Sequence, residues 1–395
     1  MNICITNVDT RPEYGGGIKR VSAVLANAWQ KAGHSVCFMS LCRSDLRPDT
    51  IGGTPQFFLP DIQDENGDRN VVFFTQFIRE QQTDVILHQH IEEPGMTALC
   101  AQVRKTAPVK VVMTYHFAPT HKLDIIDSIF FVPISSENIA KRYLRDTVMC
   151  IRWHLWRRGQ MRKELSHYFS DCLKNCDRMV VLSHRFVSDM NILTDNLFRE
   201  KIIAINNPAT YYTDRVMPDK HKTVLWCGRV EYNAKRVDRM LSIWKQITVR
   251  HPDWECFILG CGNIGHFKGL IEKYRIKNIR LLGYCDPEPY FRKGAILCMT
   301  SSTEGWGMVL VEAMAYGCVP VAYNSYASLQ DIVTDDENGF AIPAFDKKMY
   351  IRKLELLMND DSLRHRMAAR GMSDVCRFSP DKIAAEWIKL FGDTI

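Results

Sequence analysis

The chain has 395 residues and a formal net charge of +6, with 46% hydrophobic and 24% charged residues. This composition excludes a disordered chain, and the length predicts two or three domains. The net charge is too small to indicate nucleic-acid binding, and we expect no such partner. No run of about 18 apolar residues occurs, so no segment is expected to span a membrane.

The 14 cysteines form no metal-binding or disulfide pattern. None stands in a Cys-x-x-Cys pair or near histidines at zinc-finger spacing, and many lie inside apolar runs. Buried thiols in a reducing compartment are therefore expected. The N-terminus lacks the features of a signal peptide, so we expect a cytoplasmic protein.

The chain begins with a strand–helix–strand pattern. A strand at 2–7 leads through the glycine run 15–17 to a helix whose apolar residues are three and four positions apart. Gly33 is predicted to end this helix in a left-handed conformation, and a strand at 35–41 follows. The pattern predicts parallel strands with a right-handed crossover.

The same pattern runs to residue 207 and then restarts. Buried strands are predicted at 85–88, 109–114, 179–182 and 202–205, and again at 223–227, 256–259, 279–282, 295–299 and 319–322. We therefore predict an α/β protein with two Rossmann-like doubly wound domains facing each other across a cleft. The predicted parts are domains at 1–207 and 223–378, a hinge at 208–222, and a C-terminal helix at 379–395 that packs back on the first domain.

A basic cluster lies between the strand 223–227 and the next helix. Arg229 follows Gly228, and Lys235 and Arg236 stand just before the helix begins. Cations at a helix N-terminus oppose the helix dipole, whereas a bound anion would use both the cations and the free backbone amides. The cluster therefore indicates a diphosphate site, with a solvated basic loop as the alternative.

Two acids flank a glycine turn further along. Glu304 precedes Gly307, and Glu312 lies inside the helix that begins there, so the amides of Met308 and Val309 could contact an anion. Carboxylates accept hydrogen bonds from hydroxyls, which favours a sugar or ribose near the acids. The alternative is a helix-capping acid and a buried, paired acid.

Other strand ends carry glycines and histidines. Gly260 and Gly262 follow the strand 256–259, where they either form a turn or let the backbone come close to a ligand. Gly16 and Gly17 stand before the first helix. Among the strand-end histidines we favour binding to a sugar hydroxyl for His116 and a structural role for His88. For His90 the sequence favours neither of these two roles over the other.

These motifs resemble glycosyltransferase family 4, a group of retaining enzymes with the GT-B fold. The match covers nearly the whole chain and is strongest over 223–343. Its centre is Glu304 to Glu312, continuing to Val321 as Ala-Met-Ala-Tyr-Gly-Cys-Val-Pro-Val. The other matching elements are Gly228-Arg229, Lys235, Gly260-x-Gly262, Leu282-Gly283-Tyr284 and Asn338-Gly339-Phe340.

The resemblance implies a role for each element. It implies transfer of a hexose from a nucleotide-diphosphate sugar, with UDP favoured, and no metal or other cofactor. The acceptor would be a glycan or a polyprenyl-lipid-linked glycan of cell-surface polysaccharide or lipopolysaccharide synthesis, bound by the first domain. The implied catalytic residues are Arg229 and Lys235 at the diphosphate, with Glu304 and His116 at the sugar. The implied donor-binding residues are Gly16, Gly17, Gly228, Gly260, Gly262, Tyr284 at the base, Gly307, Met308, Val309, and Glu312 at the ribose.

The chain departs from the family in two places. The segment 324–331 replaces a common Gly-Gly-x-x-Glu motif, and Trp306 stands where a smaller aromatic residue is usual. Both positions bear on the shape of the sugar pocket. A nucleotide-sugar epimerase of the same fold and a non-catalytic sugar-nucleotide-binding subunit remain alternatives to a transferase.

Residues 141–163 combine many arginines and lysines with tryptophan and leucine and contain a single acid, Asp146. Such a helix suits an anionic membrane surface, which would make the protein peripheral at the inner face of the membrane. The alternative is a helix packed on its own domain with solvated charges.

Overall fold

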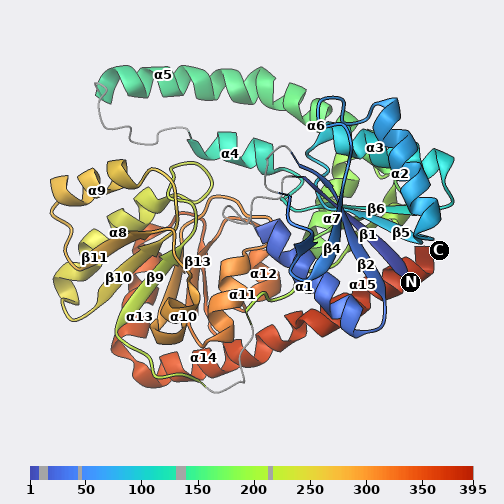
Figure 1. The fold of residues 1–395 in the computed structure, drawn as a ribbon. Coiled ribbons are helices and arrows are strands. Elements are labelled where there is room, and N and C mark those ends of the chain that lie inside the picture. The colour runs from blue at the N-terminus through green and yellow to red at the C-terminus, as the bar shows by residue number, and fades with distance from the viewer. Residues whose placement is uncertain (9–16, 43–46, 130–138, 212–216, 395) are drawn as a thin grey trace. The chain divides into compact units, whose positions relative to one another are not determined.

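The computed structural model describes residues 1–8, 17–42, 47–129, 139–211 and 217–394 (Figure 1). Contacts divide the chain into two compact units. The first contains Met1–Pro119, Lys163–Thr210 and Phe378–Ile395, and the second contains Thr120–Arg162 and Tyr211–Arg377. Residues 120–162, which the sequence analysis assigns to the first domain, thus belong to the second unit in this division.

The first unit is built on an eight-stranded sheet in the order β3-β4-β2-β1-β5-β6-β7-β8. The pairings are parallel except between β3 and β4. Short apolar runs identified most of the strands, but β3 and β4 were missed because they are brief strands near one edge of the sheet with little apolar pattern. The strands are β1 (Asn2–Val8), β2 (Ser35–Leu41), β3 (Thr50–Ile51), β4 (Thr54–Phe58), β5 (Val85–His88), β6 (Lys110–Tyr115), β7 (Arg178–Val181) and β8 (Ile202–Ala204).

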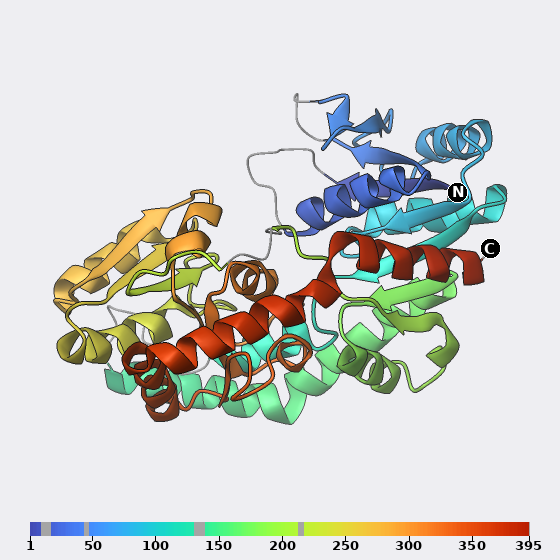
Figure 2. The same ribbon diagram turned by 90° about the horizontal axis from the view of Figure 1, so that it is seen from below.

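Two helices from opposite ends of the chain lie against each other in this unit. The apolar face of α1 (Gly17–Lys31) is buried, and Gly33 follows it with a φ of 85°, as predicted. The two helices run side by side in Figure 2, α1 in blue and α15 (Pro380–Thr394) in red. The indole of Trp29 donates a hydrogen bond of 3.0 Å to the carbonyl oxygen of Ala384 in α15. The other helices of this unit are α2 (Asp68–Glu80), α3 (Pro94–Thr106) and α7 (His184–Leu193), with most of α6 (Arg158–Lys174).

The second unit contains a six-stranded parallel sheet in the order β11-β10-β9-β12-β13-β14. The chain adds strands on one side of β9, then returns to add strands on the other side, so the strand order reverses between β9 and β12. This is a doubly wound sheet, and β1 and β5 form the equivalent reversal in the first unit. The strands are β9 (Thr223–Cys227), β10 (Glu255–Leu259), β11 (Ile279–Gly283), β12 (Ile296–Met299), β13 (Val319–Asn324) and β14 (Phe340–Pro343).

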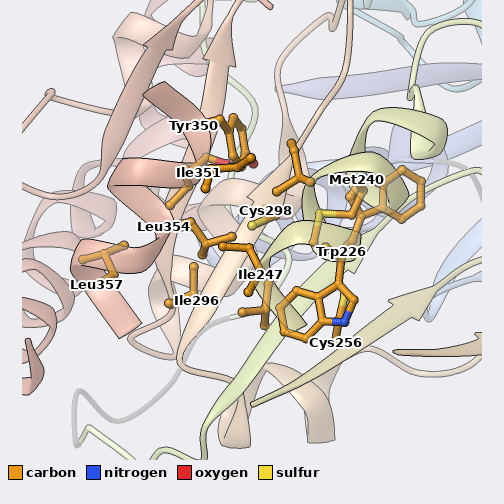
Figure 3. Close-up of a cluster of buried hydrophobic side chains, with 14 of the residues drawn as sticks. Trp226, Met240, Ile247, Cys256, Ile296, Cys298, Tyr350, Ile351, Leu354 and Leu357 are labelled. Carbon is orange, nitrogen blue, oxygen red and sulfur yellow. The ribbon is translucent and has the colours of Figure 1, made fainter. Parts of the chain in front are cut away.

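The core of the second unit lies between this sheet and two helices, α8 (Val237–Arg250) and α13 (Lys347–Asn359). Figure 3 shows Trp226, Met240 and Leu354 among the buried side chains of this core. Cys256 and Cys298 are fully buried there, and burial raises the pKa of the Cys298 thiol to about 12. The expectation of core thiols is therefore confirmed at these positions.

The second unit contains further helices along its chain. They are α4 (His121–Ile129), α5 (Ile139–Arg152), α9 (Ile264–Lys273), α10 (Glu288–Lys293), α11 (Met308–Ala315), α12 (Leu329–Ile332) and α14 (Asp361–Asp374). A π-helical turn at Trp153–Arg157 connects α5 to α6 without a break. No helix within the described ranges is both long and apolar enough to cross a bilayer.

Gly260 and Gly262 allow two backbone segments to touch. The amide of Gly228 donates to the carbonyl oxygen of Leu259 at 3.0 Å, and the amide of Val230 donates to that of Cys261 at 2.8 Å. A Cβ on Gly260 would lie 1.9 Å from the carbonyl oxygen of Gly228, and the φ of Gly260 is 138°. Both observations require glycine at position 260.

We predict that Gly260→Ala lowers the free energy of unfolding by at least about 2 kcal/mol, because the new methyl group clashes with backbone. Gly269→Ala is the matched control: it lies in α9, where an added Cβ meets nothing within 4 Å. The control should raise that free energy by roughly 0.5–1 kcal/mol through helix propensity. Urea unfolding curves measure both, and equal stability of the two variants would contradict the close approach.

Candidate functional site

The loops after β9 and β12 lie side by side where the strand order of the second sheet reverses. The amide of Ser302 donates to the carbonyl oxygen of Ala234 at 2.7 Å. The Thr300 hydroxyl donates to the carbonyl oxygen of Arg236 at 2.9 Å and accepts from the Trp226 indole at 3.0 Å. Ligands of doubly wound sheets bind at this position, outside the carboxyl ends of the strands.

An ion pair joins these two loops. The Lys235 Nζ lies 2.7 Å from each carboxylate oxygen of Glu304, and the Ser301 hydroxyl donates to Glu304 Oε1 at 2.6 Å. The Glu304 side chain is 9% exposed and the Lys235 side chain 26%. The structure thus brings together two residues that the sequence singled out for one site. A buried carboxylate needs such partners because an unpaired charge is costly to bury.

The other two basic residues of this loop differ from Lys235. The Arg229 side chain is 72% exposed, and its Nη1 lies 4.0 Å from Glu231 Oε2, so it does not join the Lys235–Glu304 pair. Arg236 is buried and forms a bidentate ion pair with Asp238, in which both hydrogen bonds measure 2.9 Å. Arg236 therefore stabilises the start of α8, whereas Arg229 is available to a ligand.

The glycine turn between the two acids has the expected form. Gly307 has a φ of 85° and caps the N-terminus of α11, where Met308 and Val309 are half-buried. Two residues of the segment 324–331 support this loop. The Ser325 hydroxyl donates to the carbonyl oxygen of Ser301 at 2.8 Å, and the buried Tyr326 hydroxyl donates to Met299 Sδ at 2.8 Å.

The other residues singled out in this unit lie at different depths. Glu312 is buried on α11 with 1% of its surface exposed, and Trp306 is buried in the loop before it. Tyr284 follows β11 directly and is 71% exposed. A ring with this exposure can stack against a planar ligand.

His121 lies beside the ion pair, although the sequence analysis did not single it out. It is the first residue of α4, and its Nδ1 is 3.4 Å from the Thr303 hydroxyl. Burial lowers the pKa of His121, while the Glu304 carboxylate acts in the opposite direction and Lys235 in the same one. The sequence feature that could have pointed to His121 is its position only five residues after His116.

The first unit carries uncharged polar groups at the ends of β5 and β6. The His116 Nε2 lies 2.7 Å from Gln89 Oε1 and donates to it, and His116 is buried. Burial, with a smaller effect of His90, lowers the pKa of His116 to about 3, and burial lowers that of His90 to about 4. The His116 Nδ1, the Gln89 Nε2 and the His90 Nε2 are buried with no hydrogen-bond partner among the described residues. They can serve hydroxyl groups of a ligand.

His88 differs because both ring nitrogens have protein partners. Its Nδ1 lies 2.7 Å from the Thr6 hydroxyl and its Nε2 lies 2.9 Å from the Thr97 hydroxyl. These contacts agree with the structural role predicted for His88. Of the glycine run, Gly17 is the first residue of α1, and Gly16 lies outside the described residues.

Two family models match consecutive parts of the chain. The model described as Glycosyltransferase Family 4 matches residues 15–208, and the model described as Glycosyl transferases group 1 matches residues 213–374. The chain belongs to glycosyltransferase family 4. The two doubly wound sheets are those of the GT-B fold, as predicted.

This family 4 protein is similar to glycosyltransferases along nearly its whole length. It is 23% identical to an uncharacterized glycosyltransferase of Haemophilus influenzae, across 94% of this chain and 95% of that protein. It is 22% identical to a Campylobacter jejuni α-1,4-N-acetyl-D-galactosaminyltransferase named for an undecaprenol-diphosphate-linked substrate, across 54% of this chain and 62% of the relative. The structure of Anabaena HepE in complex with UDP and glucose superimposes with a TM-score of 0.72 at 13% identity, covering 100% of both chains.

We predict that acidification destabilises this glycosyltransferase through its buried histidines. Burial lowers the pKa of His88 to about 3, so between about pH 6.5 and 3 the unfolded chain holds a proton there that the folded chain does not. Stability therefore falls as the pH drops below about 6.5, by up to about 1.4 kcal/mol per pH unit for this residue.

Urea unfolding at about pH 7.5 and at about pH 5 measures this slope. The variant His88→Asn should show a shallower pH dependence than the wild type, whatever its absolute stability. His167→Asn, at an exposed position on α6, is the control and should keep the wild-type slope. An unchanged slope in His88→Asn would refute the assignment.

Proposed function

We propose that this family 4 glycosyltransferase moves a hexose-type sugar from a UDP-sugar to a lipid-linked glycan, with retention of configuration and without a metal ion. The Lys235–Glu304 pair at the strand-order reversal of the second sheet carries the proposal, because it combines a cation for phosphate with a carboxylate for hydroxyls. The UDP and glucose in the HepE structure and the undecaprenol-diphosphate-linked substrate in the name of the Campylobacter relative support the two substrates.

Donor binding rearranges the ion pair in this proposal. The diphosphate competes with Glu304 for Lys235, and the exposed Arg229 turns toward the same negative charge. Glu304 then accepts hydrogen bonds from the sugar hydroxyls in place of Lys235. The amides of Met308 and Val309 at the start of α11 add positive ends of backbone dipoles. Glu312 binds the ribose, and Tyr284 contacts the base.

The reaction takes place on one face of the sugar. The bond from the anomeric carbon to the diphosphate oxygen breaks, and a bond to the acceptor oxygen forms on the same side. The departing diphosphate oxygen takes the proton of the acceptor hydroxyl, so no separate carboxylate base is required. Lys235 and Arg229 stabilise the charge that develops on the leaving group. The chain contains no Asp-x-Asp segment, a common metal-binding pattern of other transferases.

The first unit contributes neutral hydrogen-bonding groups to the sugars. His116 and Gln89 hold each other in position, and each keeps one buried nitrogen for a hydroxyl. Because burial holds the pKa of His116 at about 3, its ring is uncharged at neutral pH and suits a hydroxyl better than a phosphate. His116 therefore contacts the transferred sugar in this proposal.

We predict that Lys235→Ala and Arg229→Ala each lower kcat by about 100-fold or more, since each removes one group that stabilises the departing diphosphate. Glu304→Gln should raise KM for the donor as well, because the amide presents a different pattern of donors and acceptors to the hydroxyls. The measurement is release of UDP from UDP-hexoses, with a lipid-linked glycan as acceptor and the anomeric configuration of the product read by NMR.

Lys222→Ala, at an exposed lysine paired with Asp253, is the control and should keep wild-type activity. Wild-type rates in both Lys235→Ala and Arg229→Ala would reject the site. Loss of activity in EDTA would reject metal independence, and an inverted product would reject retention. An altered sugar formed from donor alone would identify an epimerase, and donor binding with no turnover would identify a non-catalytic subunit.

We further propose that the segment of residues 141–163, whose side chains the structure describes from residue 145 on, binds an anionic membrane surface. Several of its apolar side chains face solvent, with exposed fractions of 57% for Val148, 82% for Leu155 and 56% for Trp156, whereas Trp153 is buried. Arg152 and Arg157 are exposed beside them. Exposed leucine and tryptophan next to arginine suit the boundary between lipid headgroups and acyl chains, which would hold the enzyme at the inner face of the membrane near a lipid-linked acceptor.

We predict that the protein co-sediments with vesicles containing phosphatidylglycerol and that Leu155→Glu weakens this binding about tenfold or more, because burying a leucine contributes roughly 2 kcal/mol. Leu197→Glu is the matched control, since Leu197 is 73% exposed outside the segment. Binding should weaken at high salt and on neutral phosphatidylcholine vesicles. Equal binding of the two variants would exclude the segment, and absence of binding at low salt would exclude the membrane role.

A further inference from the structure

A cavity of about 460 Å³ lies over the outer face of α8 in the second unit. Side chains of α8 line it together with side chains from α9 and the segment after it, from the loop after β9, from β13 and from the segment after β14. Its size is that of a small-molecule site. The proposed donor and acceptor roles use none of the side chains that line it.

The charged side chains around this cavity favour an anion. Arg239, Lys245 and Lys347 line it, and the only carboxylate in the lining belongs to Asp238. Asp238 is already neutralised by its two-pronged ion pair with Arg236. The lining is therefore positive overall, and a bound anion would meet at least two lysines.

The apolar side chains that line the cavity favour an anion that also carries an aromatic ring. The residues Tyr274 and Phe345 are 48% and 44% exposed, and the Lys245 Nζ lies 5.0 Å from the centroid of the Tyr274 ring. Leu241 and Leu270 supply further apolar surface. Two of the lining hydroxyls already have protein partners: that of Ser242 accepts from Lys347 at 2.6 Å, and that of Tyr232 lies 2.7 Å from His266 Nε2. An aromatic ring can bury its faces against the apolar side chains while its anionic group meets the cations.

The backbone at Phe345 adds an independent indication of function. Phe345 has a φ of 67°, a left-handed conformation that a bulky residue rarely adopts, and yet its ring is partly exposed. The Arg239 guanidinium lies 3.7 Å from the centroid of this ring. Strained residues of this kind concentrate at ligand sites, where the surrounding structure holds them in place.

Arg239 connects the cavity to the Lys235–Glu304 site. Its Nη1 donates to the Ser302 hydroxyl at 3.1 Å and lies 3.4 Å from the carbonyl oxygen of Thr300. Both residues belong to the loop that carries Glu304. A ligand that stacks against Phe345 or contacts Arg239 would therefore act directly on that loop.

We propose that the cavity over α8 binds a small aromatic anion, and that Arg239 transmits its occupancy to the loop that holds Glu304. The binding site is independent of the proposed function. The transmission rests on the proposed function, because it is measured through UDP.

The binding test uses 8-anilinonaphthalene-1-sulfonate, an aromatic sulfonate that fluoresces in apolar sites, with the full-length protein. One molecule should bind. Lys245→Gln should raise its dissociation constant about fivefold, as expected for losing one partly exposed ion pair. Leu270→Trp should abolish binding by filling the cavity, with folding checked by circular dichroism. Lys268→Gln, at an exposed position on α9 outside the lining, is the matched control. Unchanged binding in both Lys245→Gln and Leu270→Trp would overturn the site.

The transmission test measures UDP binding with and without saturating probe. Coupled sites change each other's affinity by the same factor. Saturating probe should therefore change the dissociation constant of UDP by some factor, and saturating UDP should change the dissociation constant of the probe by that same factor and no further. A shift that grows without limit as UDP rises would mean that the probe competes in the donor site, which overturns the proposal. No shift would overturn the transmission alone. Absence of UDP binding would contradict the proposed function while the probe titration still decides the cavity.

Discussion

The reversal of strand order between β9 and β12 is the constraint on which the second unit's chemistry depends. It leaves the carboxyl ends of two neighbouring strands without a connection passing over them, so their loops can approach each other. Hydrogen bonds from Ser302 and Thr300 then fix the loops at short range. Lys235 and Glu304, far apart in sequence, meet only because of this arrangement. The arrangement thus places a cation and a carboxylate together at the strand-order reversal.

The two units present different chemistry at their strand ends. The second unit offers charges, in Lys235 and Arg229, whereas the first offers buried neutral nitrogens at Gln89, His90 and His116. Phosphate is best stabilised by the former and hydroxyls by the latter. A transferase that must hold both a nucleotide diphosphate and sugars needs both kinds of surface. The low pKa of His116 follows from burial, so the neutrality of the first unit's site comes directly from packing.

The sequence predicted the fold, and it singled out Lys235 and Glu304, which the structure pairs, because both depend on local patterns. Apolar runs identify the buried strands, and the Glu304–Glu312 spacing identifies the loop and helix after β12. The short strands β3 and β4, near one edge of the first sheet, lack such a run. The positions of Arg229 and His121 could not be predicted, because they depend on long-range contacts or on their absence. The cavity over α8 likewise combines segments that only the folded sheet brings together.

The widened turn at Trp153–Arg157 lets one continuous helix serve two environments. A π turn accommodates one extra residue, which rotates the side chains beyond it by about 100° relative to an uninterrupted α-helix. Before and within this turn, Val148 and Leu155 face outward, and beyond it Leu165 and Phe169 are buried. The turn thus separates a stretch with exposed apolar residues from a stretch with buried ones. Deleting one residue from this turn would undo the rotation and force one of the two stretches out of its proper environment.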